Sequence, residues 1–340
     1  MTHPAKANSA GLCSESHSMP TLEHIASEEA LHQAFLDARK GKRNRGPVER
    51  YERNLGANLI ATRQALLDGS YRPRPTRQFM VTEPKPRVID APAFYDSVVQ
   101  HSIYRAVYPV FDRGFIHDNY GCRIGKGTHR AADQLQRFMR QCDGDEYYLQ
   151  LDIRKFYYSI NHDLLRERVA RKVADTRVVS LMMQFVGGGS TGLFIGNLLS
   201  QLFGLIYLDR MDHHIKRHLR IKRYLRYVDD FVLVGLALAE AQELKAHLEQ
   251  WLADNLELKL SKWRIAKVRQ GINFVGFRTW RSTRFVRRRS MSNFSKALRA
   301  EKIDSVRSIL ANAKHTASHR YFIERIQRES SNHDLLSIAC

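Results

Sequence analysis

Three aspartates stand out in this chain because apolar residues enclose them. Asp152 belongs to the alternating run over 147–153, which predicts a β-strand. Asp229 and Asp230 are adjacent, between Tyr227 and the apolar run 231–234, and this order indicates a short hairpin with the acidic pair at its tip. Adjacent carboxylates on a tight turn repel each other more strongly as solvent is excluded. Taken alone, the pair also fits an ordinary aspartate-rich turn.

Divalent cations would relieve this repulsion. Mg²⁺ prefers oxygen ligands, keeps several waters and commonly shares its coordination shell with substrate phosphates. Two such ions stabilise both the attacking and the leaving oxygen of an in-line phosphoryl displacement. The three aspartates therefore predict a metal-dependent phosphoryl-transfer site, provided that the partner is a polyanion.

The charge of the chain favours such a partner. Its 340 residues contain 55 Lys and Arg but 35 Asp and Glu, which gives a formal net charge of +20. This balance points to nucleic acid or an anionic membrane surface. The longest apolar run, 231–239, is too short for a spanning helix, and residues 1–20 lack the apolar core of a secretory signal. The four cysteines are scattered and indicate neither a disulfide framework nor a structural zinc site, so a reducing cytoplasm is expected.

The spacing of apolar residues predicts the helices and strands that position the aspartates. On the strand 147–153, Asp152 shares a side with Tyr148 and Gln150, which we expect to face away from the core. A helix is predicted to start near Ser27, and the chain from Arg281 onward is predicted to be basic and mostly helical. Further helices are predicted over 50–67, 98–110, 128–140, 162–186, 198–219 and 239–255, a hairpin over 78–99, and strands over 264–268 and 272–277.

The order of these parts resembles that of reverse transcriptases. The sequence YVDD at 227–230 is similar to their YxDD box, and LDIRKFYYSI at 151–160 is similar to their first catalytic motif. The resemblance includes EPKPR at 83–87, CRIGKGTH at 122–129 and GINFVGF at 271–277, and it spans residues 27–340. It implies an α+β right-hand polymerase fold, with fingers, a palm built as an antiparallel sheet packed on helices, and a helical thumb. It also implies RNA-directed DNA polymerase activity, a nucleotidyl transfer.

The motif GLFIGNLLSQ at 192–201 resembles one subfamily, the reverse transcriptases of diversity-generating retroelements. Intron-encoded and retroviral enzymes usually place Gln before the glycine and Ser-Pro at the end, whereas this chain has Ile195 and Ser200-Gln201. The chain length without RNase H or endonuclease domains and the terminal Cys340 agree with this subfamily. Phe194 departs from it, because the family normally has Pro there.

The resemblance also implies roles at the catalytic centre. Asp152 and Asp229, with the carbonyl of Ile153, would hold two Mg²⁺ ions, for which Mn²⁺ can substitute, and Asp230 would be a looser ligand. Lys262 is a candidate general acid for pyrophosphate release, with Lys259 as its competitor.

Substrate contacts are implied in the same way. Lys85 and Arg87 match residues that grip the incoming dNTP, although a solvated turn also accounts for Lys85. Tyr157 falls where the family places a steric gate against the 2′-hydroxyl, with a core aromatic as the alternative. Ile195 and Gln201 would lie beside the nascent pair. Basic residues of two segments are expected to contact the nucleic acid, namely Arg123, Lys126, Arg284, Arg287, Arg288 and Arg289.

Four parts are expected along the chain: a mobile N-terminal tail (1–26), fingers with N-terminal helices (27–130), a palm with interleaved fingers elements (131–280) and a basic thumb (281–340). The resemblance implies cDNA synthesis on a retroelement template RNA through a cDNA/RNA hybrid. It further implies errors at template adenines, mutagenic retrohoming with target-gene diversification, and a basic oligomeric accessory protein. We expect a cytoplasmic, bacterial or phage-encoded protein without membrane contact.

Two alternatives remain open from the sequence. A retron-like or phage-defence reverse transcriptase carries the same catalytic motifs, and an RNA-binding, maturase-like scaffold keeps the fold without synthesis.

Overall fold

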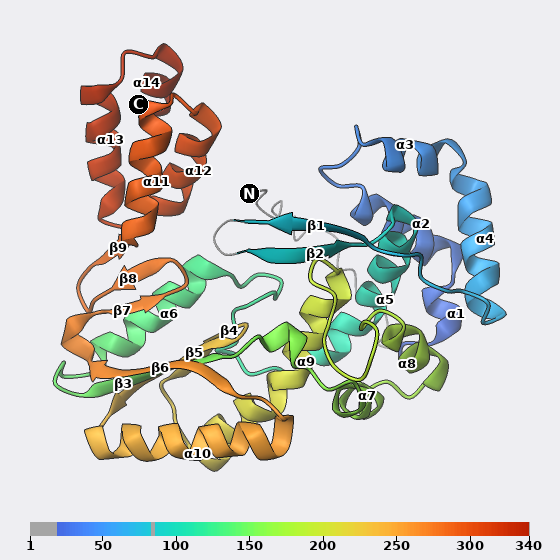
Figure 1. Ribbon diagram of the computed structural model, residues 1–340, viewed down its shortest axis with the longest axis horizontal. Helices are drawn as coiled ribbons and strands as arrows, with labels where there is room; N and C mark the ends of the chain where they lie inside the picture. The colour runs from blue at the N-terminus through green and yellow to red at the C-terminus, as the bar shows by residue number, and fades with distance from the viewer. Residues whose placement is uncertain (1–18, 83–85, 340) are drawn as a thin grey trace. The chain divides into compact units, whose positions relative to one another are not determined.

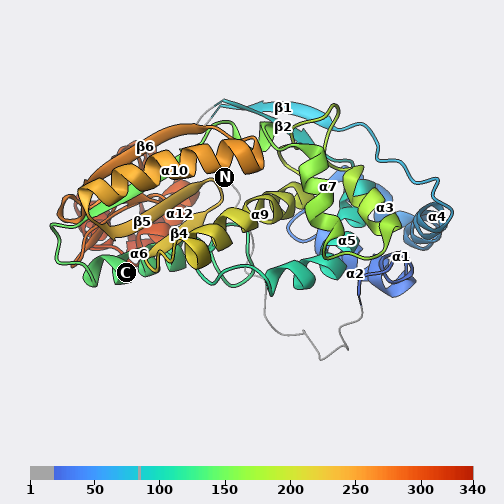
Figure 2. The same cartoon turned by 90° about the horizontal axis from the view of Figure 1, so that it is seen from below.

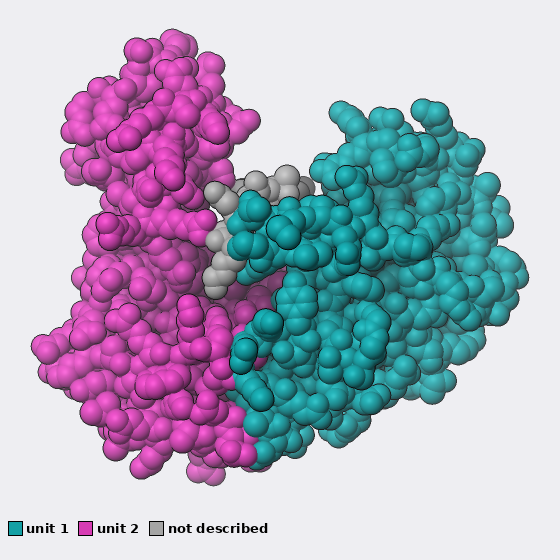
Figure 3. Space-filling view, in the orientation of Figure 1, with its two compact units in different colours: residues 1–116, 154–214, 251–259 teal, residues 117–153, 215–250, 260–340 magenta. Residues whose placement is uncertain are grey.

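Helices and antiparallel strands share the chain in the computed structural model, which describes residues 19–82 and 86–339 (Figure 1). The chain divides into two compact units, each assembled from separate stretches (Figure 3). Unit 1 contains 1–116, 154–214 and 251–259, and unit 2 contains 117–153, 215–250 and 260–340. This mixture of helices and antiparallel sheets is the α+β class predicted from the sequence. Within the described ranges, no helix has the length and apolar character that crossing a membrane requires.

Unit 1 is mainly helical. Ser27 caps its second helix by accepting a hydrogen bond from the Ala30 N–H, as predicted. Leu31 and Phe35 of that helix are buried. The helices are α1 (Leu22–Ile25), α2 (Glu28–Ala38), α3 (Gly46–Arg53), α4 (Leu55–Leu67), α5 (Phe94–Asp112), α7 (His162–Ala170), α8 (Thr176–Met183) and α9 (Leu198–His213).

Three predictions for this unit need correction. The helix expected over 50–67 is two helices, because the backbone breaks at Asn54. The helix expected over 162–186 is also interrupted, because Asp175 caps a new helix, α8, by accepting the Arg177 N–H. Residues 22–25, expected in a mobile tail, form α1 with buried Leu22 and Ile25, since apolar side chains there reach the core. Residues 1–18 of that tail and Cys340 lie outside the described residues.

The predicted hairpin of unit 1 is present. β1 (Arg77–Val81) pairs antiparallel with β2 (Arg87–Ala91), with Phe79 opposite Ile89. The predicted tip, including Lys85, lies outside the described residues. Gln78 donates a side-chain hydrogen bond to Asp90 across the two strands at 2.8 Å.

The central sheet of unit 2 has four antiparallel strands in the order β4-β5-β3-β6. They are β3 (Tyr147–Ile153), β4 (Tyr224–Tyr227), β5 (Asp230–Leu236) and β6 (Leu260–Lys267). The predicted strand 147–153 is confirmed and lies between β5 and β6. Helix α10 (Leu238–Leu256) runs along the sheet (Figures 1 and 2), and Lys245 of this helix lies 5.4 Å from the centre of the Trp263 ring on β6.

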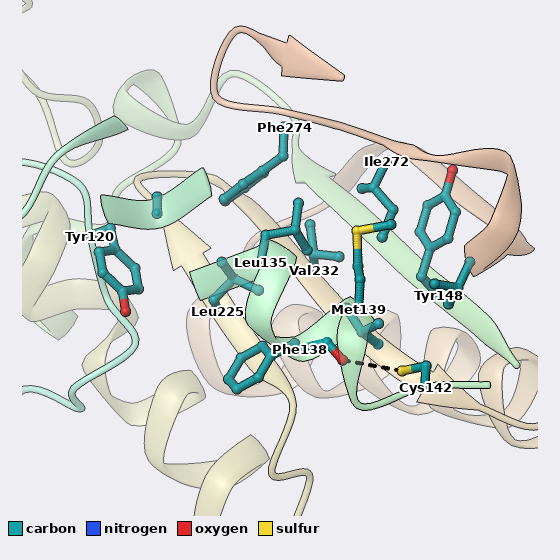
Figure 4. Packing of buried hydrophobic residues seen from close by; sticks show 13 residues of the cluster. Tyr120, Leu135, Phe138, Met139, Cys142, Tyr148, Leu225, Val232, Ile272 and Phe274 are labelled. Carbon is teal, nitrogen blue, oxygen red and sulfur yellow. Dashed lines mark hydrogen bonds between the residues drawn. The ribbon is translucent and has the colours of Figure 1, made fainter. Parts of the chain in front are cut away.

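The other face of this sheet packs on α6 (Thr128–Arg140), which has the predicted bounds. Figure 4 shows Met139 of α6, Tyr148 of β3 and Ile272 gathered in one apolar cluster. The prediction that the Tyr148 side of β3 faces away from the core is therefore wrong. The cause is that the segment containing Ile272, later in the chain, covers this face of the sheet. The face therefore stays accessible only near the end of β3, at Asp152, which is half-buried.

A second antiparallel sheet follows, in the order β7-β8-β9. The single strand predicted over 272–277 is a hairpin, because Val275 and Gly276 both take positive φ values, 45° and 93°, and turn the chain. The strands are β7 (Ile272–Phe274), β8 (Phe277–Thr279) and β9 (Arg284–Val286). The predicted basic helical segment then follows as α11 (Arg288–Arg299), α12 (Ile303–Ala313), α13 (Ser318–Glu329) and α14 (His333–Ala339).

Strand β9 was not predicted, and it changes the interpretation of Arg284. The Arg284 side chain is 3% exposed and its Nη1 lies 2.8 Å from the Asp133 carboxylate on α6. Its Nη2 lies 3.3 Å from the Gln136 side chain. The prediction of a nucleic-acid contact therefore does not hold for Arg284, since its guanidinium is buried against α6.

This buried pair leads to a stability prediction. Asp133→Asn should lower the free energy of unfolding by about 2 kcal/mol, because the buried Arg284 cation loses a charge-assisted hydrogen bond. Asp304→Asn is the matched control, since the Asp304 side chain is fully exposed in its pair with Arg307 and such pairs contribute little. Urea unfolding of both variants measures the difference, and equal midpoints would contradict the assignment.

Candidate active site

Three charged residues form a row across the central sheet. Asp152 on β3 is the direct partner of Asp230 on β5, and on its other side it is the partner of Lys262 on β6. Cross-strand partners place their side chains on the same face of a sheet, about 4.5–5.5 Å apart at Cβ. The fold therefore brings two carboxylates and one ammonium together from residues 110 positions apart.

The third aspartate lies in the turn beside this row. β4 ends at Tyr227 and β5 begins at Asp230, so Val228 and Asp229 are the two turn residues, as the predicted hairpin requires. The Asp229 carbonyl accepts a hydrogen bond from the Ile153 N–H at 3.4 Å. This contact ties the turn to the end of β3 and brings Asp229 to the same end of the sheet as Asp152.

The turn itself has an unusual backbone. Val228 has a φ of +57°, which is strained for a β-branched residue. Gly121 packs directly against it: a Cβ built at Gly121 would lie 2.5 Å from the Val228 N and 2.7 Å from its Cγ2. The Gly121 segment is fixed in turn, because Tyr120 N–H donates to the Arg226 carbonyl of β4 at 2.9 Å. A glycine is therefore required where the chain passes the turn that contains Val228 and Asp229.

The carboxylates of Asp152 and Asp230 accept hydrogen bonds from neighbouring side chains, and nearby charges shift the pKa of Asp230. The Gln150 amide donates to Asp230 Oδ1 at 2.9 Å and to the Asn273 carbonyl at 2.9 Å. The Ser261 hydroxyl donates to the Asp152 carboxylate. Burial raises the pKa of Asp230 to about 7; the negative charges of Asp152 and Asp229 act in the same direction, against the Gln150 hydrogen bond and the nearby Arg287. The site thus holds more negative charge than its own hydrogen bonds offset.

A pocket of about 900 Å³ opens over Asp152 and Asp230. Its wall is basic and aromatic, comprising Lys262, Arg264, Arg278, Arg287, Arg288 and Arg289 together with Trp263, Trp280 and Phe285. The Trp263 and Phe285 side chains are 57% and 41% exposed. Cations pair with phosphates, and exposed aromatic rings stack on bases or sugars. The pocket thus joins a carboxylate centre to a surface suited to a nucleic-acid strand.

The carboxylates fit a divalent cation as a partial ligand set. Over residues 19–82 and 86–339, no group of three His, Cys, Asp or Glu side chains is arranged to enclose a metal ion. Asp152 and Asp230 are nevertheless adjacent, and their mutual repulsion is the condition that a cation would relieve. Mg²⁺ suits such an open site, since it commonly binds one or two carboxylates and completes its shell with water and substrate phosphates.

The two candidate lysines differ in position. Lys262 is exposed, lines the pocket and is the cross-strand partner of Asp152. Lys259 precedes β6, and its carbonyl accepts the Arg154 N–H at 2.8 Å. Of these two lysines, Lys262 is the one that lies in the row with Asp152.

The candidate nucleotide contacts that the structure describes belong to unit 1. Arg87 begins β2 and is exposed. Tyr157 is half-buried, whereas its neighbour Phe156 is 2% exposed and is the core aromatic of that segment. The Ile195 carbonyl accepts the Asp90 N–H at 2.7 Å, which ties its loop to β2, and Gln201 is exposed in the first turn of α9.

The remaining basic candidates separate into two groups. Arg123 and Lys126 donate to carbonyls of their own segment, those of Asn119 at 3.2 Å and His117 at 2.9 Å. Arg287, Arg288 and Arg289 line the pocket beside Asp152 and Asp230, and the Arg287 Nε is buried without a hydrogen-bond partner among the described residues. Arg287, Arg288 and Arg289 are therefore better placed than Arg123 and Lys126 to contact a nucleic-acid strand.

Sequence reasoning missed three residues of the site. Gln150 and Ser261 hold the carboxylates, and Gly121 supports the turn. Gln150 shares a side of β3 with Asp152, so strand alternation could have identified it. Ser261 and Gly121 carry no comparable signal, because their positions depend on long-range packing.

A model of the family described as reverse transcriptase (RNA-dependent DNA polymerase) matches residues 81–279, more than half of the chain. The chain belongs to the reverse transcriptase family. Protein YkfC of Escherichia coli K12 is 25% identical over 272 residues, 66% of this chain and 71% of YkfC. The group II intron-encoded protein LtrA of Lactococcus lactis subsp. cremoris is 25% identical over 165 residues, which is 45% of this chain but only 27% of LtrA.

Solved telomerase structures share the fold of this reverse transcriptase family member. Telomerase from Candida albicans, in complex with a fragment of telomeric RNA, gives a TM-score of 0.51 at 12% identity, covering 78% of this chain and 55% of that chain. Apo telomerase from Candida tropicalis gives a TM-score of 0.51 at 13% identity, covering 76% of this chain and 58% of that chain. The predicted right-hand polymerase fold is confirmed. The family prediction is confirmed as well, while the diversity-generating subfamily stays a prediction.

Proposed function

We propose that this reverse transcriptase family member is an active RNA-directed DNA polymerase that makes cDNA from a retroelement template RNA and miscopies template adenines. One observation carries the enzymatic part: Asp152 and Asp230 are cross-strand partners beside the Asp229 turn, below a basic and aromatic pocket. A protein that only bound RNA would need the basic wall but not the carboxylates.

The residues of unit 2 would divide the chemistry among them. Asp152 and Asp229, with the Ile153 carbonyl, would hold two Mg²⁺ ions, and Asp230 would be a looser ligand. When bound, such ions supply activation of the primer 3′-hydroxyl and charge stabilisation at the α-phosphate. Lys262 would donate a proton to the leaving pyrophosphate, and Arg287 to Arg289 would pair with phosphates of the strand.

Residues of unit 1 would select the nucleotide. Arg87, with Lys85, would grip the triphosphate of the dNTP, and Tyr157 would exclude a ribose 2′-hydroxyl. Ile195 and Gln201 would lie beside the nascent base pair, with Arg123 and Lys126 as further contacts to nucleic acid. These roles come from the family motif that each residue matches.

Errors at adenine would arise from Ile195. An aliphatic side chain cannot supply the hydrogen bonds of the Gln that related enzymes usually place before this glycine. Its loop is held to β2 by the hydrogen bond from the Asp90 N–H to the Ile195 carbonyl, so the backbone at Ile195 is held in place. Loss of a polar contact at the base pair would weaken discrimination there, since a missing hydrogen-bonding group changes selectivity strongly.

The cellular setting belongs to the same proposal. We infer mutagenic retrohoming that diversifies a target gene, a basic oligomeric accessory protein that recruits the RNA, and a cytoplasmic location in a bacterium or phage-infected cell. The net charge of +20 supports an RNA or cDNA/RNA hybrid as the main partner.

Sequencing of cDNA made on a defined RNA tests this function. Errors should concentrate at template adenines, and Ile195→Gln should lower the adenine error frequency about tenfold or more by restoring a polar contact, with other positions unchanged. Ile60→Gln on α4 is the matched control, since it makes the same change at a side chain that is 64% exposed. Evenly distributed errors would instead favour a retron-like or phage-defence enzyme, and RNA binding without cDNA would favour a maturase-like scaffold.

A further inference from the structure

Unit 1 contains a second pocket, of about 640 Å³, that none of the catalytic roles uses. The segment 73–78, the start of α5 and the loop before α9 form it. Its volume falls within the range of small-molecule and nucleotide sites. Several of its polar side chains have a buried atom that no hydrogen-bond partner within the described part of the chain satisfies.

Gln100 of α5 is the best defined of these. Its Oε1 accepts the N–H groups of Leu198 at 3.0 Å and Leu199 at 3.5 Å, so it caps the N-terminus of α9. An NH₂ group cannot accept those bonds, which fixes the orientation of the amide. Its Nε2 is then the free end, and this atom is buried without a hydrogen-bond partner among the described residues, in a side chain that is 1% exposed.

Two more amides line the same pocket. Asn197 is 2% exposed, and among the described residues neither its buried Oδ1 nor the buried Oε1 of Gln184 has a hydrogen-bond partner. A buried polar atom without a partner destabilises the fold, so most such atoms bind a ligand or an ordered water. Donor and acceptor groups of three amides in one pocket therefore form a recognition surface that nothing within the described chain satisfies.

Aromatic rings and prolines supply the apolar part of the pocket wall. Phe185 and Phe194 line it together with Pro73, Pro75 and Pro92. Both backbone polar groups of Phe194 are hydrogen-bonded: its N–H donates to the Val186 carbonyl at 3.2 Å, and its carbonyl accepts the Ser200 hydroxyl at 2.6 Å. A proline at this position could not donate the first of these bonds. The Phe that departs from the family pattern thus adds an aromatic ring to this pocket.

The pocket has two charged side chains among the described residues, those of Asp96 and Arg74. Asp96 accepts the Tyr71 hydroxyl at 2.6 Å and the Arg74 N–H at 2.9 Å, so its carboxylate is committed. The Arg74 guanidinium lies 3.9 Å from the centre of the Tyr95 ring, its Nη1 lies 3.7 Å from Asp96 Oδ1, and its side chain is 49% exposed. A guanidinium has five N–H donors, so Arg74 can keep this ion pair and still pair with a phosphate beside the pocket.

We propose that this pocket binds one unpaired nucleobase of the single-stranded template RNA, with Arg74 on its phosphate. Glutamine and asparagine amides offer a donor and an acceptor side by side, the pattern that base edges complement. Aromatic rings provide a face for stacking, as in other sites for single-stranded RNA. The identity of the strand rests on the proposed polymerase function, whereas the base-sized amide pocket does not.

An abasic scan tests this proposal. The probe is an RNA template annealed to a DNA primer with a dideoxy 3′ end, leaving a short single-stranded RNA overhang. Removing the base at each overhang position in turn should lower the affinity about tenfold or more at one position, and little elsewhere. A scan with no sensitive position, obtained with protein that extends unblocked primers, would overturn the proposal and leave ordered water as the occupant.

Gln100→Glu identifies the residue that reads the base. Glutamate keeps an oxygen for the Leu198 and Leu199 N–H groups but replaces the free NH₂ donor with an oxygen. We expect about a tenfold loss of affinity for the intact hybrid and no loss for the hybrid abasic at the sensitive position. Gln64→Glu on α4 is the matched control, since it adds the same charge on an exposed surface outside the pocket.

Phe194→Leu supplies a second variant that leaves the cap of α9 untouched. It removes the aromatic face and should lower affinity for the intact hybrid severalfold, again without effect on the abasic one. Equal losses for both hybrids in both variants would mean a structural role only and would overturn the proposal. If wild-type protein extends no primer yet the abasic scan retains its sensitive position, the polymerase function fails and the base pocket stands.

Discussion

Asp229→Asn is expected to lower the rate of primer extension by about 1000-fold, because a metal ion supplies several kcal/mol of transition-state stabilisation and each 1.36 kcal/mol corresponds to tenfold in rate. The substitution keeps the size of the side chain and the Asp229 carbonyl that accepts the Ile153 N–H. Affinity for a template–primer hybrid should stay nearly unchanged, since the basic wall of the pocket supplies it. Single-turnover extension and equilibrium binding measure the two quantities separately.

Asp304→Asn is the control for this substitution. It makes the same chemical change in unit 2 at a fully exposed side chain and should leave extension unchanged. Extension by Asp229→Asn at the wild-type rate would refute the assignment of a metal ligand. A parallel loss of hybrid affinity would show that Asp229 supports the nucleic-acid surface instead.

Gly121→Ala should lower kcat about 100-fold with little change in KM. The added methyl group would lie 2.5 Å from the Val228 backbone nitrogen, so the turn must move, and displacement of a reacting group by about 1 Å can cost 10²-fold. Gly121 is a positioning residue, because it acts through the turn that carries Asp229. Steady-state kinetics with varied dNTP separates kcat from KM.

Gly56→Ala on α4 is the matched control, since nothing lies within 4 Å of a Cβ built there. It should leave kcat unchanged and slightly raise stability, as expected for alanine in a helix. Thermal unfolding of Gly121→Ala must accompany the kinetics, because overpacking also destabilises. Wild-type kcat in a folded Gly121→Ala protein would show that the turn tolerates displacement.

The sequence was informative wherever local patterns decide the structure. Alternation over 147–153 defined β3, and the order Tyr227 to Asp230 located the hairpin, so the three aspartates were found before any fold was known. Composition and motif order then led to the family. These signals work because strand periodicity and two-residue turns are local properties of the chain.

The features that could not be predicted from the sequence depend on long-range packing. Tyr148 looked exposed because alternation cannot show that α6 and β7 cover its face. Arg284 looked like a nucleic-acid contact because its sequence neighbours are arginines, while its partner Asp133 is 151 positions away. The unpaired Gln100 amide had no sequence signal at all, since its cap to Leu198 depends on the packing of α5 against α9.

Extension of a DNA primer on a defined RNA by the purified wild-type protein, with Mg²⁺ and dNTPs, tests the central claim most directly. We expect template-dependent addition of complementary nucleotides that stops when the metal is chelated, because Asp152, Asp229 and Asp230 would then lose their cations. Protein that binds the template–primer hybrid with high affinity but adds no nucleotide would contradict the account, and would leave an RNA-binding member of the reverse transcriptase family.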